Sequence, residues 1–193
     1  MPEKVYQPLI QNIRETVSIS EQELMLVLAS FQPKVLSKKE ILLQKGDISN
    51  HMRFIADGSL RVYYLNEKAQ EYTIQFGIKG WWVNDLYSYL THQPANYFIQ
   101  ALQPSVVLQI HRDSLNKLFD QIPSLERFFR IKFEKAYVAL QERTLHRASL
   151  SAKDRYEQFR AQYKDIEQNI PQYVIASYLG ITPEFLSVLR SQE

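Results

Sequence analysis

Hydrophobic and polar positions change their pattern twice along the chain. Residues 3–30 are predicted to be helical, and Ser20 with Glu23 three positions later forms a capping-box signature ahead of an apolar run. From about residue 31 to residue 112, short β-branched and aromatic runs are separated by turn signals such as Lys45-Gly46-Asp47. The runs are FQPKVL, EILLQ, MRFIAD, SLRVYYL, EYTIQF, YFIQAL and VVLQIH. Short strands at such regular spacing favour a sandwich or barrel over alternating βαβ units.

A long uninterrupted helix is predicted after Ile122-Pro123, because the following stretch contains neither Gly nor Pro. One of its faces repeats at a spacing close to that of a coiled coil, at Leu125, Phe129, Phe133, Ala136 and Leu140. A second apolar face carries Phe128, Ile131 and Val138. A helix that is apolar on two sides needs two surfaces to cover it. The β domain can supply one and a second copy of the chain the other, so we predict a symmetric homodimer. The alternative is one wide face packed within a monomer.

The last part of the chain shows the spacing of a helix-turn-helix. Gly180 ends the predicted helix QYVIASYL as a left-handed cap, and Thr182 caps a second helix that begins at Pro183. Leu186 and Leu189 would face the core of such a unit. The outward positions would be Pro183, Glu184, Ser187, Val188 and Arg190. In this motif the second helix enters the major groove of DNA, although a plain helical hairpin would show the same pattern.

Composition excludes several classes of protein. The 193 residues are 45% hydrophobic and 23% charged, which is ordinary for one large globular domain or a domain with a small appendage. The chain has no Cys, so disulfides, thiolate metal sites and cysteine-ligated iron–sulfur clusters are excluded. No apolar stretch is long enough for a membrane span, and the N-terminus lacks an apolar signal core, so a cytoplasmic protein is expected.

Charge is unevenly distributed. Residues 126–164 contain ten basic and five acidic residues, whereas residues 165–193 contain one basic and four acidic residues. A basic segment beside a DNA-reading motif would attract phosphate groups. A solvated helix face with mixed charges would look the same, and the acidic end argues against tight DNA binding.

Several motifs together resemble the Crp/Fnr family of bacterial transcription regulators, and especially its short members. They are LLQKGD (42–47), DGSLRVYY (57–64), TIQF (73–76), WWVNDLYSYLTHQP (81–94), Pro-x-x-Glu-x-Phe (123–128) and the terminal IASYLGITPEFLS. The resemblance implies an α+β fold with a cyclic-nucleotide-binding-like β jelly roll flanked by helices over residues 1–122. A long dimerisation helix over 123–149 and an all-α helix-turn-helix domain without a wing over 150–193 would follow. The implied function is that of a homodimeric DNA-binding regulator.

The resemblance also implies a set of DNA contacts. These would be made by Thr182, Pro183, Glu184, Ser187 and Arg190. Glu184 matches the family's base-reading glutamate, which can accept a hydrogen bond from cytosine. Where the family reads guanine with an arginine this chain has Val188, which cannot replace that bidentate contact. We therefore expect altered or weakened base specificity.

The segment that would hold an effector departs from the family's cyclic-AMP binders. They hold the ribose with a Gly-Glu-Leu segment and the phosphate with an Arg-Ser pair, where this chain has Asn84-Asp85-Leu86 and Ala95-Asn96. No Lys or Arg occurs from Gly80 to His111, so cyclic AMP is not expected. The candidate effector pocket is Asn84, Asp85, Leu86, Tyr87, Ala95 and Asn96. It would take an apolar or aromatic small molecule, unless the aromatic residues nearby simply form the core.

No catalytic or metal-binding motif is found. The chain lacks a P-loop, a dinucleotide fingerprint and a nucleophile elbow, and its four His residues have no metal-ligand spacing. We expect no catalytic residue, no metal, no cofactor and no membrane partner. Haem held by one of the histidines is conceivable, but each is better read as a surface or strand-end residue. Three hypotheses remain: a dimeric DNA-binding regulator, an effector-binding module that has lost specific DNA binding and acts through protein contacts, and an enzyme.

Overall fold

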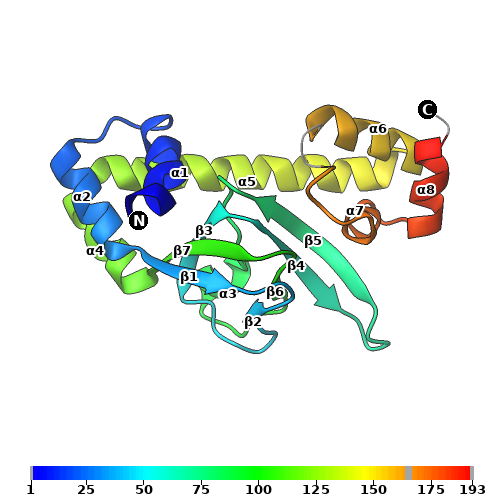
Figure 1. Cartoon of the computed structure of the whole chain (residues 1–193), viewed down its shortest axis with the longest axis horizontal. Helices are drawn as coiled ribbons and strands as arrows, with labels where there is room; N and C mark the ends of the chain where they lie inside the picture. Colours follow the sequence, from blue (N-terminus) through cyan, green and yellow to red (C-terminus); the bar gives the residue numbers. More distant parts are fainter. Residues whose placement is uncertain (1, 164–166, 192–193) are drawn as a thin grey trace.

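The computed structural model describes residues 2–163 and 167–191. Its helices are α1 (Pro2–Arg14), α2 (Glu21–Ser30), α3 (Leu86–Thr91), α4 (Arg112–Gln121), α5 (Pro123–Ser149), α6 (Ala152–Gln162), α7 (Gln172–Leu179) and α8 (Pro183–Ser191). Its strands are β1 (Gln32–Leu36), β2 (Ile41–Leu43), β3 (His51–Asp57), β4 (Ser59–Leu65), β5 (Glu71–Ile78), β6 (Phe98–Ala101) and β7 (Ser105–His111). Helix α5 runs the length of the molecule, with α1, α2 and α4 at one end, the strands beside its middle and α6 to α8 at the other end (Figure 1).

The seven strands predicted from the sequence are all present. They form two antiparallel sheets, a three-stranded sheet in the order β1-β7-β3 and a four-stranded sheet in the order β2-β6-β4-β5. The sheets pack face to face over a core that includes Leu36, Ile55, Leu60, Val62, Ile99 and Val107. The predicted α+β class with an N-terminal antiparallel β domain is therefore confirmed, as two open sheets rather than a closed barrel.

Strand β3 of the three-stranded sheet is buried on both faces, which explains its nearly continuous apolar run. Ile55 faces the opposite sheet, whereas Phe54 faces a second core beneath α1, α2, α4 and the start of α5. The Trp82 ring is central to this second core, with ring centroids 5.3 Å from Phe54 and 5.1 Å from Phe129. Alternate side chains of one strand thus bury apolar area on two sides.

The N-terminal helices follow their sequence signals. Ser20 and Glu23 form the predicted capping box at the start of α2. Helix α4 was not predicted, although Leu115, Leu118 and Phe119 have helical spacing and pack on the second core. The helix is only ten residues long and begins directly after β7, so its apolar spacing is too short to be distinguished from the end of the strand.

Helix α5 changes its surroundings along its length, and this corrects the predicted dimer contacts. Phe129 is only 2% exposed because it packs against Trp82 and Phe119 of its own chain, and Phe133 is partly buried on the same cluster. Phe129 therefore belongs to the core of the chain and not to a surface for a second copy. Ala136 and Leu140, by contrast, are exposed.

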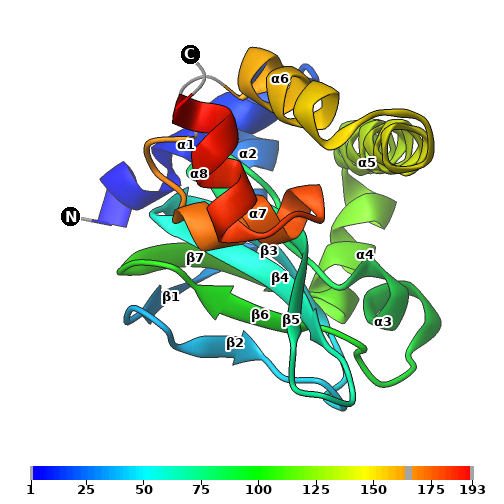
Figure 2. The same cartoon turned by 90° about the vertical axis from the view of Figure 1, so that its right-hand side faces the viewer.

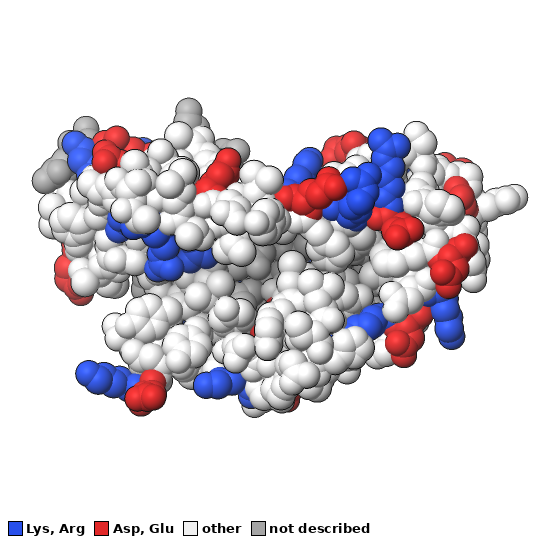
Figure 3. Space-filling view, turned by 180° about the vertical axis from the view of Figure 1, so that it is seen from behind, with Lys and Arg blue, Asp and Glu red and all other residues white. Residues whose placement is uncertain are grey.

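Beyond its midpoint α5 carries uncovered apolar side chains. Their exposed fractions are 62% for Tyr137, 54% for Val138, 57% for Leu140 and 62% for Leu145. Figure 2 looks along α5 and shows that one side of the helix has no neighbouring element. Figure 3 shows the molecule from behind, where uncharged surface lies among separate groups of basic and acidic side chains. Clustered rather than single exposed apolar side chains are a sign of a partner surface.

We predict that Phe129→Ala lowers the free energy of unfolding by about 3–5 kcal/mol, because it leaves a cavity among packed rings. Urea denaturation followed by circular dichroism measures this. Val35→Ala on β1, where the side chain is 75% exposed, is the control and should change stability by less than about 0.5 kcal/mol. Similar small effects of both substitutions would contradict the placement of Phe129.

Candidate nucleic-acid interface and effector site

The turn between α7 and α8 has the geometry that the sequence predicts. Gly180 has φ of 72°, in the left-handed region that favours glycine, and the amide of Ile181 donates to the carbonyl of Ala176 at 3.0 Å. The Thr182 hydroxyl accepts from the Phe185 amide at 3.2 Å and so caps α8. These local contacts fix the direction in which α8 leaves the turn.

Helix α8 presents one buried and one open face. Leu186 and Leu189 are buried, as predicted, and pack on a third core with α6 and α7. The open face carries Thr182, Pro183, Glu184, Phe185, Ser187 and Val188, all exposed. Hydrogen bonds with the backbone and with the Thr182 side chain lower the pKa of Glu184, so its carboxylate stays an acceptor at neutral pH.

Arg190, the fifth predicted DNA contact, has an internal partner. Its Nε lies 3.5 Å from the carboxylate of Glu167, which also accepts from the Tyr156 hydroxyl at 2.8 Å. Arg190 therefore ties the last turn of α8 to the segment before α7. To contact a phosphate group it would have to leave this carboxylate.

The helix pair does not project freely from the β domain. Helix α7 lies over the outer face of the four-stranded sheet (Figure 2). The Ser177 hydroxyl accepts from the Thr73 amide at 2.8 Å and donates to the Glu71 carbonyl, so it occupies hydrogen-bonding positions at the edge strand β5. Phe76 of β5 inserts into the third core against Phe159 and Tyr178.

Arg143 of α5 joins the same elements. Its guanidinium donates to the carbonyls of Thr73, at 3.1 Å, and Ile74, and lies 4.2 Å from the centre of the Tyr178 ring. Burial lowers its pKa, but the group remains a cation at physiological pH. The long helix, the sheet and α7 thus meet at one side chain.

The predicted effector residues do come together, but their polar groups bind one another. The buried carboxylate of Asp85 caps α3 by accepting from the Ser88 amide at 3.0 Å, and it also accepts from the Asn96 amide at 3.2 Å. The Asn84 side chain accepts from the Arg53 amide at 3.0 Å. Ala95 is buried, while Tyr87 is half exposed. Asp85 and Asn84 therefore hold the segment in place rather than offer open acceptors.

Sequence reasoning missed Arg53, which lies 31 positions before Asn84. Its guanidinium is buried, donates to the Ser49 hydroxyl at 3.0 Å and to the His51 carbonyl, and leaves Nε without a partner among the described residues. Burial lowers its pKa to about 10, and the charge of Asp85 opposes that shift. The apolar run MRFIAD gives no local sign of this, because the partners are brought together only by the sheet.

Within residues 2–163 and 167–191, no three His, Asp or Glu side chains are grouped so that they could hold a metal ion. None of the helices described combines the length and the hydropathy that crossing a membrane requires.

Known proteins resemble this chain over most of its length. Residues 33–122 match the family model described as cyclic nucleotide-binding domain. The "Anaerobic regulatory protein" of Haemophilus influenzae is 25% identical over 169 residues, which are 81% of this chain and 64% of that protein. The "Fumarate and nitrate reduction regulatory protein" of Yersinia pestis is 26% identical over 168 residues, 81% of this chain and 66% of that protein. The chain thus spans less than two thirds of the length of these relatives.

Solved structures share its fold. A mutant of CooA from Carboxydothermus hydrogenoformans aligns with a TM-score of 0.72 and 21% identity over 86% of this chain and 77% of that chain. FixK2 from Bradyrhizobium japonicum aligns with a TM-score of 0.70 and 18% identity over 84% of this chain and 83% of that chain. At such identities the agreement concerns the arrangement of the elements.

We predict that Asp85→Ala destabilises the fold by about 3–5 kcal/mol, because it removes a helix cap and leaves the buried Arg53 without its opposing charge. Thermal and urea unfolding measure the loss. Asp113→Ala is the control, since its side chain is 76% exposed, and should cost less than about 0.5 kcal/mol. An unchanged midpoint for Asp85→Ala would show that the carboxylate is available for a ligand.

Proposed function

We propose that this chain, which belongs to the Crp/Fnr family, is a homodimeric DNA-binding transcription regulator that works without cyclic AMP. The observation that carries the proposal is the open face of α8. Thr182, which caps the helix, and Glu184 and Ser187 are exposed there. Leu186 and Leu189 are buried on the opposite face and hold the helix in place. The first turn of such a helix is the part that reaches base edges. The names of the relatives support regulation as the biological role.

The contribution of each DNA-facing residue follows from its chemistry. Glu184 would accept a hydrogen bond from cytosine, and Thr182 and Ser187 would donate to phosphate or base edges. Val188 can contribute only apolar contact, for example with a thymine methyl group. Arg190 would help with phosphate only after leaving Glu167. The base preference would therefore rest on few direct contacts.

The dimer would form through the second half of α5. Tyr137, Val138, Leu140 and Leu145 are exposed there, and Ala136 leaves room for a close approach of two helices. A two-fold axis along α5 would double the weak contacts of α8 and place half-sites about one helical turn apart. The division into a β domain over 1–122, a dimerisation helix over 123–149 and a DNA-binding domain over 150–193 is part of this proposal.

Independence from cyclic AMP is supported by the segment around α3. A cyclic phosphate there would meet the buried carboxylate of Asp85 and no unpaired cation on its own segment. Repulsion by that carboxylate and the absence of a paired guanidinium both weaken phosphate binding. The segment could still respond to a neutral, aromatic molecule beside Leu86 and Tyr87.

One observation favours a second function. Val188 is 48% exposed and stands where the family reads guanine with an arginine, so that base contact is missing. The chain would then be an effector-responsive module that has lost specific DNA reading and acts through protein contacts. Exposed Phe185 and Val188 on α8 would suit an apolar partner. Binding to DNA separates the two functions.

We expect fluorescence anisotropy to detect binding to DNA from upstream of the chain's own gene, with a Kd that rises steeply between 50 and 200 mM salt, as counterion release requires. Val188→Arg should tighten binding to guanine-containing half-sites by roughly 5- to 100-fold, the size of one bidentate contact. Val188→Ala is the matched control and should leave the preference unchanged. Weak binding with a shallow salt slope that is identical in all three proteins would favour the second function.

We predict that Leu140→Glu turns the dimer into a monomer. Two carboxylates, one from each copy, would be buried in the seam, so the dimer Kd should rise at least a hundredfold. Analytical ultracentrifugation over a concentration series measures this. Leu26→Glu on α2, where the native side chain is 52% exposed, is the control and should stay dimeric. A Leu140→Glu protein that remains a dimer would place the seam elsewhere.

A further inference from the structure

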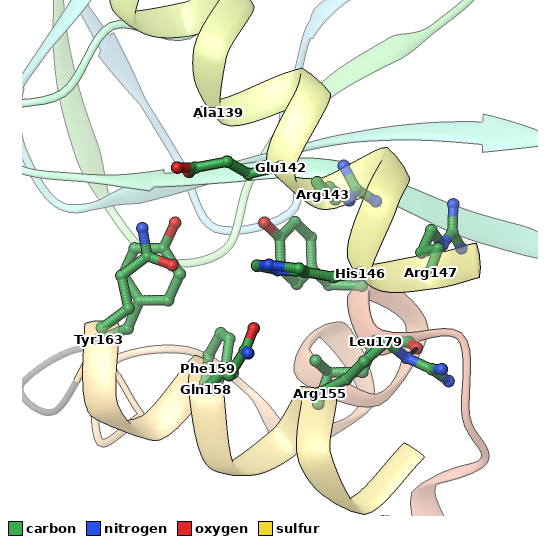
Figure 4. A pocket seen from close by; sticks show the side chains of 12 residues that line it. Ala139, Glu142, Arg143, His146, Arg147, Arg155, Gln158, Phe159, Tyr163 and Leu179 are labelled. Atoms are coloured by element: carbon green, nitrogen blue, oxygen red, sulfur yellow. Dashed lines mark hydrogen bonds between the residues drawn. The ribbon is translucent and has the colours of Figure 1, made fainter. Parts of the chain in front are cut away.

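A cavity of about 80 Å³ lies between the second half of α5 and helices α6 and α7. One water molecule needs roughly 10–15 Å³ of such space, so the cavity has room for a small organic molecule. Figure 4 shows that Arg143, His146 and Arg147 reach it from α5, and Arg155, Phe159 and Tyr163 from α6. Leu179 closes it from α7.

The cavity has three guanidinium groups, and no carboxylate among the described residues is bound to any of them. Arg143 donates to carbonyls of β5, and Arg155 donates to the carbonyls of Leu179, at 3.2 Å, and Leu150, at 2.8 Å. The buried Nε of Arg143 lacks a partner within residues 2–163 and 167–191. Arg147 has no hydrogen-bond or ion-pair partner in that part of the chain, and one of its Nη atoms lies near Gly180. Backbone carbonyls do not neutralise cations, so the cavity is electropositive at this end.

The remaining wall is aromatic. The rings of Phe159 and Tyr163 lie 5.2 Å apart, and Tyr178 joins them with its face under the Arg143 guanidinium. Glu142 is the one acidic residue of the lining and stands at the opposite end from Arg147 and Arg155, above Tyr163 (Figure 4). A ligand with an anionic group at one end and a flat apolar body at the other would match both ends.

The proposed dimer seam and this cavity share part of α5. The exposed residues Tyr137 and Leu145 lie on the side of the helix opposite the lining residues, whereas Ala136 and Leu140 lie on the same side as Arg143 and Arg147, seven positions before them. Helices α6 and α7 of the same chain complete the lining, so the site is present in a single chain.

We infer that this cavity is a binding site for a small aromatic carboxylate, with the carboxylate group held by Arg147 and Arg155 and the ring against Phe159 and Tyr163. A carboxylate accepts two parallel hydrogen bonds from a guanidinium, which fits two arginines that carry unused N–H groups. Ligand binding by α5, α6 and α7 does not require that the chain bind DNA.

The test uses the full chain and benzoate as probe, with benzyl alcohol as the uncharged ring and inorganic phosphate as the anion without a ring. Isothermal titration calorimetry should show one benzoate per chain. At a hundredfold excess over Kd benzoate should raise Tm by roughly 5–10 °C. Benzyl alcohol and phosphate should bind at least tenfold more weakly. Absence of benzoate binding, or equal affinity for phosphate, would overturn the inference.

Two substitutions with opposite expected signs locate the site. Arg147→Gln should weaken benzoate binding at least tenfold by removing a charged hydrogen bond, while Glu142→Gln should tighten it about threefold by removing repulsion. Arg127→Gln, an equal loss of charge at an exposed position of the same helix, should change nothing. If Arg147→Gln binds benzoate normally, or if it loses only DNA affinity in the anisotropy assay, the arginines serve another partner and the site is rejected.

Discussion

The partly buried guanidinium of Arg143 is the contact on which the arrangement of the whole chain depends. It reaches from α5 to two carbonyls of β5 and lies over the Tyr178 ring of α7. Removing a cation from water is unfavourable, and here carbonyl dipoles and an aromatic face offset part of that cost. Because three elements share one side chain, a shift of β5 cannot leave both α5 and α7 in their places.

This junction determines where α8 can point. Helix α8 is joined to α7 by the tight turn at Gly180 and by Leu186 and Leu189 in the third core, so the two helices move as one unit. That unit rests on β5 through Ser177 and Phe76. In a dimer, the separation of the two α8 helices would depend on how each pair rests on its own sheet. A ligand that changes the β5–α7 contact would thus change the position of α8 by favouring one of two packings.

Much of the fold could be predicted because its signals are local. Seven strands, the capping box at Ser20 and the left-handed turn at Gly180 each depend on a few consecutive residues. The burial of Phe129 could not be read in this way, since a coiled-coil-like spacing does not say which surface covers a helix. The apolar spacing predicts the helix, but residues of the same chain, and not a second copy, cover its first half at Phe129.

The candidate site was predicted less completely for the same reason. The open face of α8 follows from helical spacing within ten residues, whereas the role of Asp85 depends on Arg53 and that of Arg143 on Thr73, 70 positions away. The sequence does not show that the Asp85 carboxylate is occupied, because its donors are the backbone amides of Ser88 and Asn96, which any residue would supply. Lys164 of the basic segment lies outside the described residues.

The distribution of arginines indicates where an anionic signal can act on this chain. Arg53 already has Ser49, His51 and the charge of Asp85, so an incoming anion near α3 would have to replace contacts that the fold uses. Arg147 makes no hydrogen bond or ion pair with the part of the chain that the structure describes, so it would lose no such contact on binding an anion. An anion therefore gains more binding free energy in the α5–α6 cavity than in the β domain. Arg147, which would hold it, lies one helical turn from Arg143. Recognition there would act directly on the side chain that holds α5, β5 and α7 together, so the shortest route from a ligand to α8 bypasses the segment around α3 in the β domain.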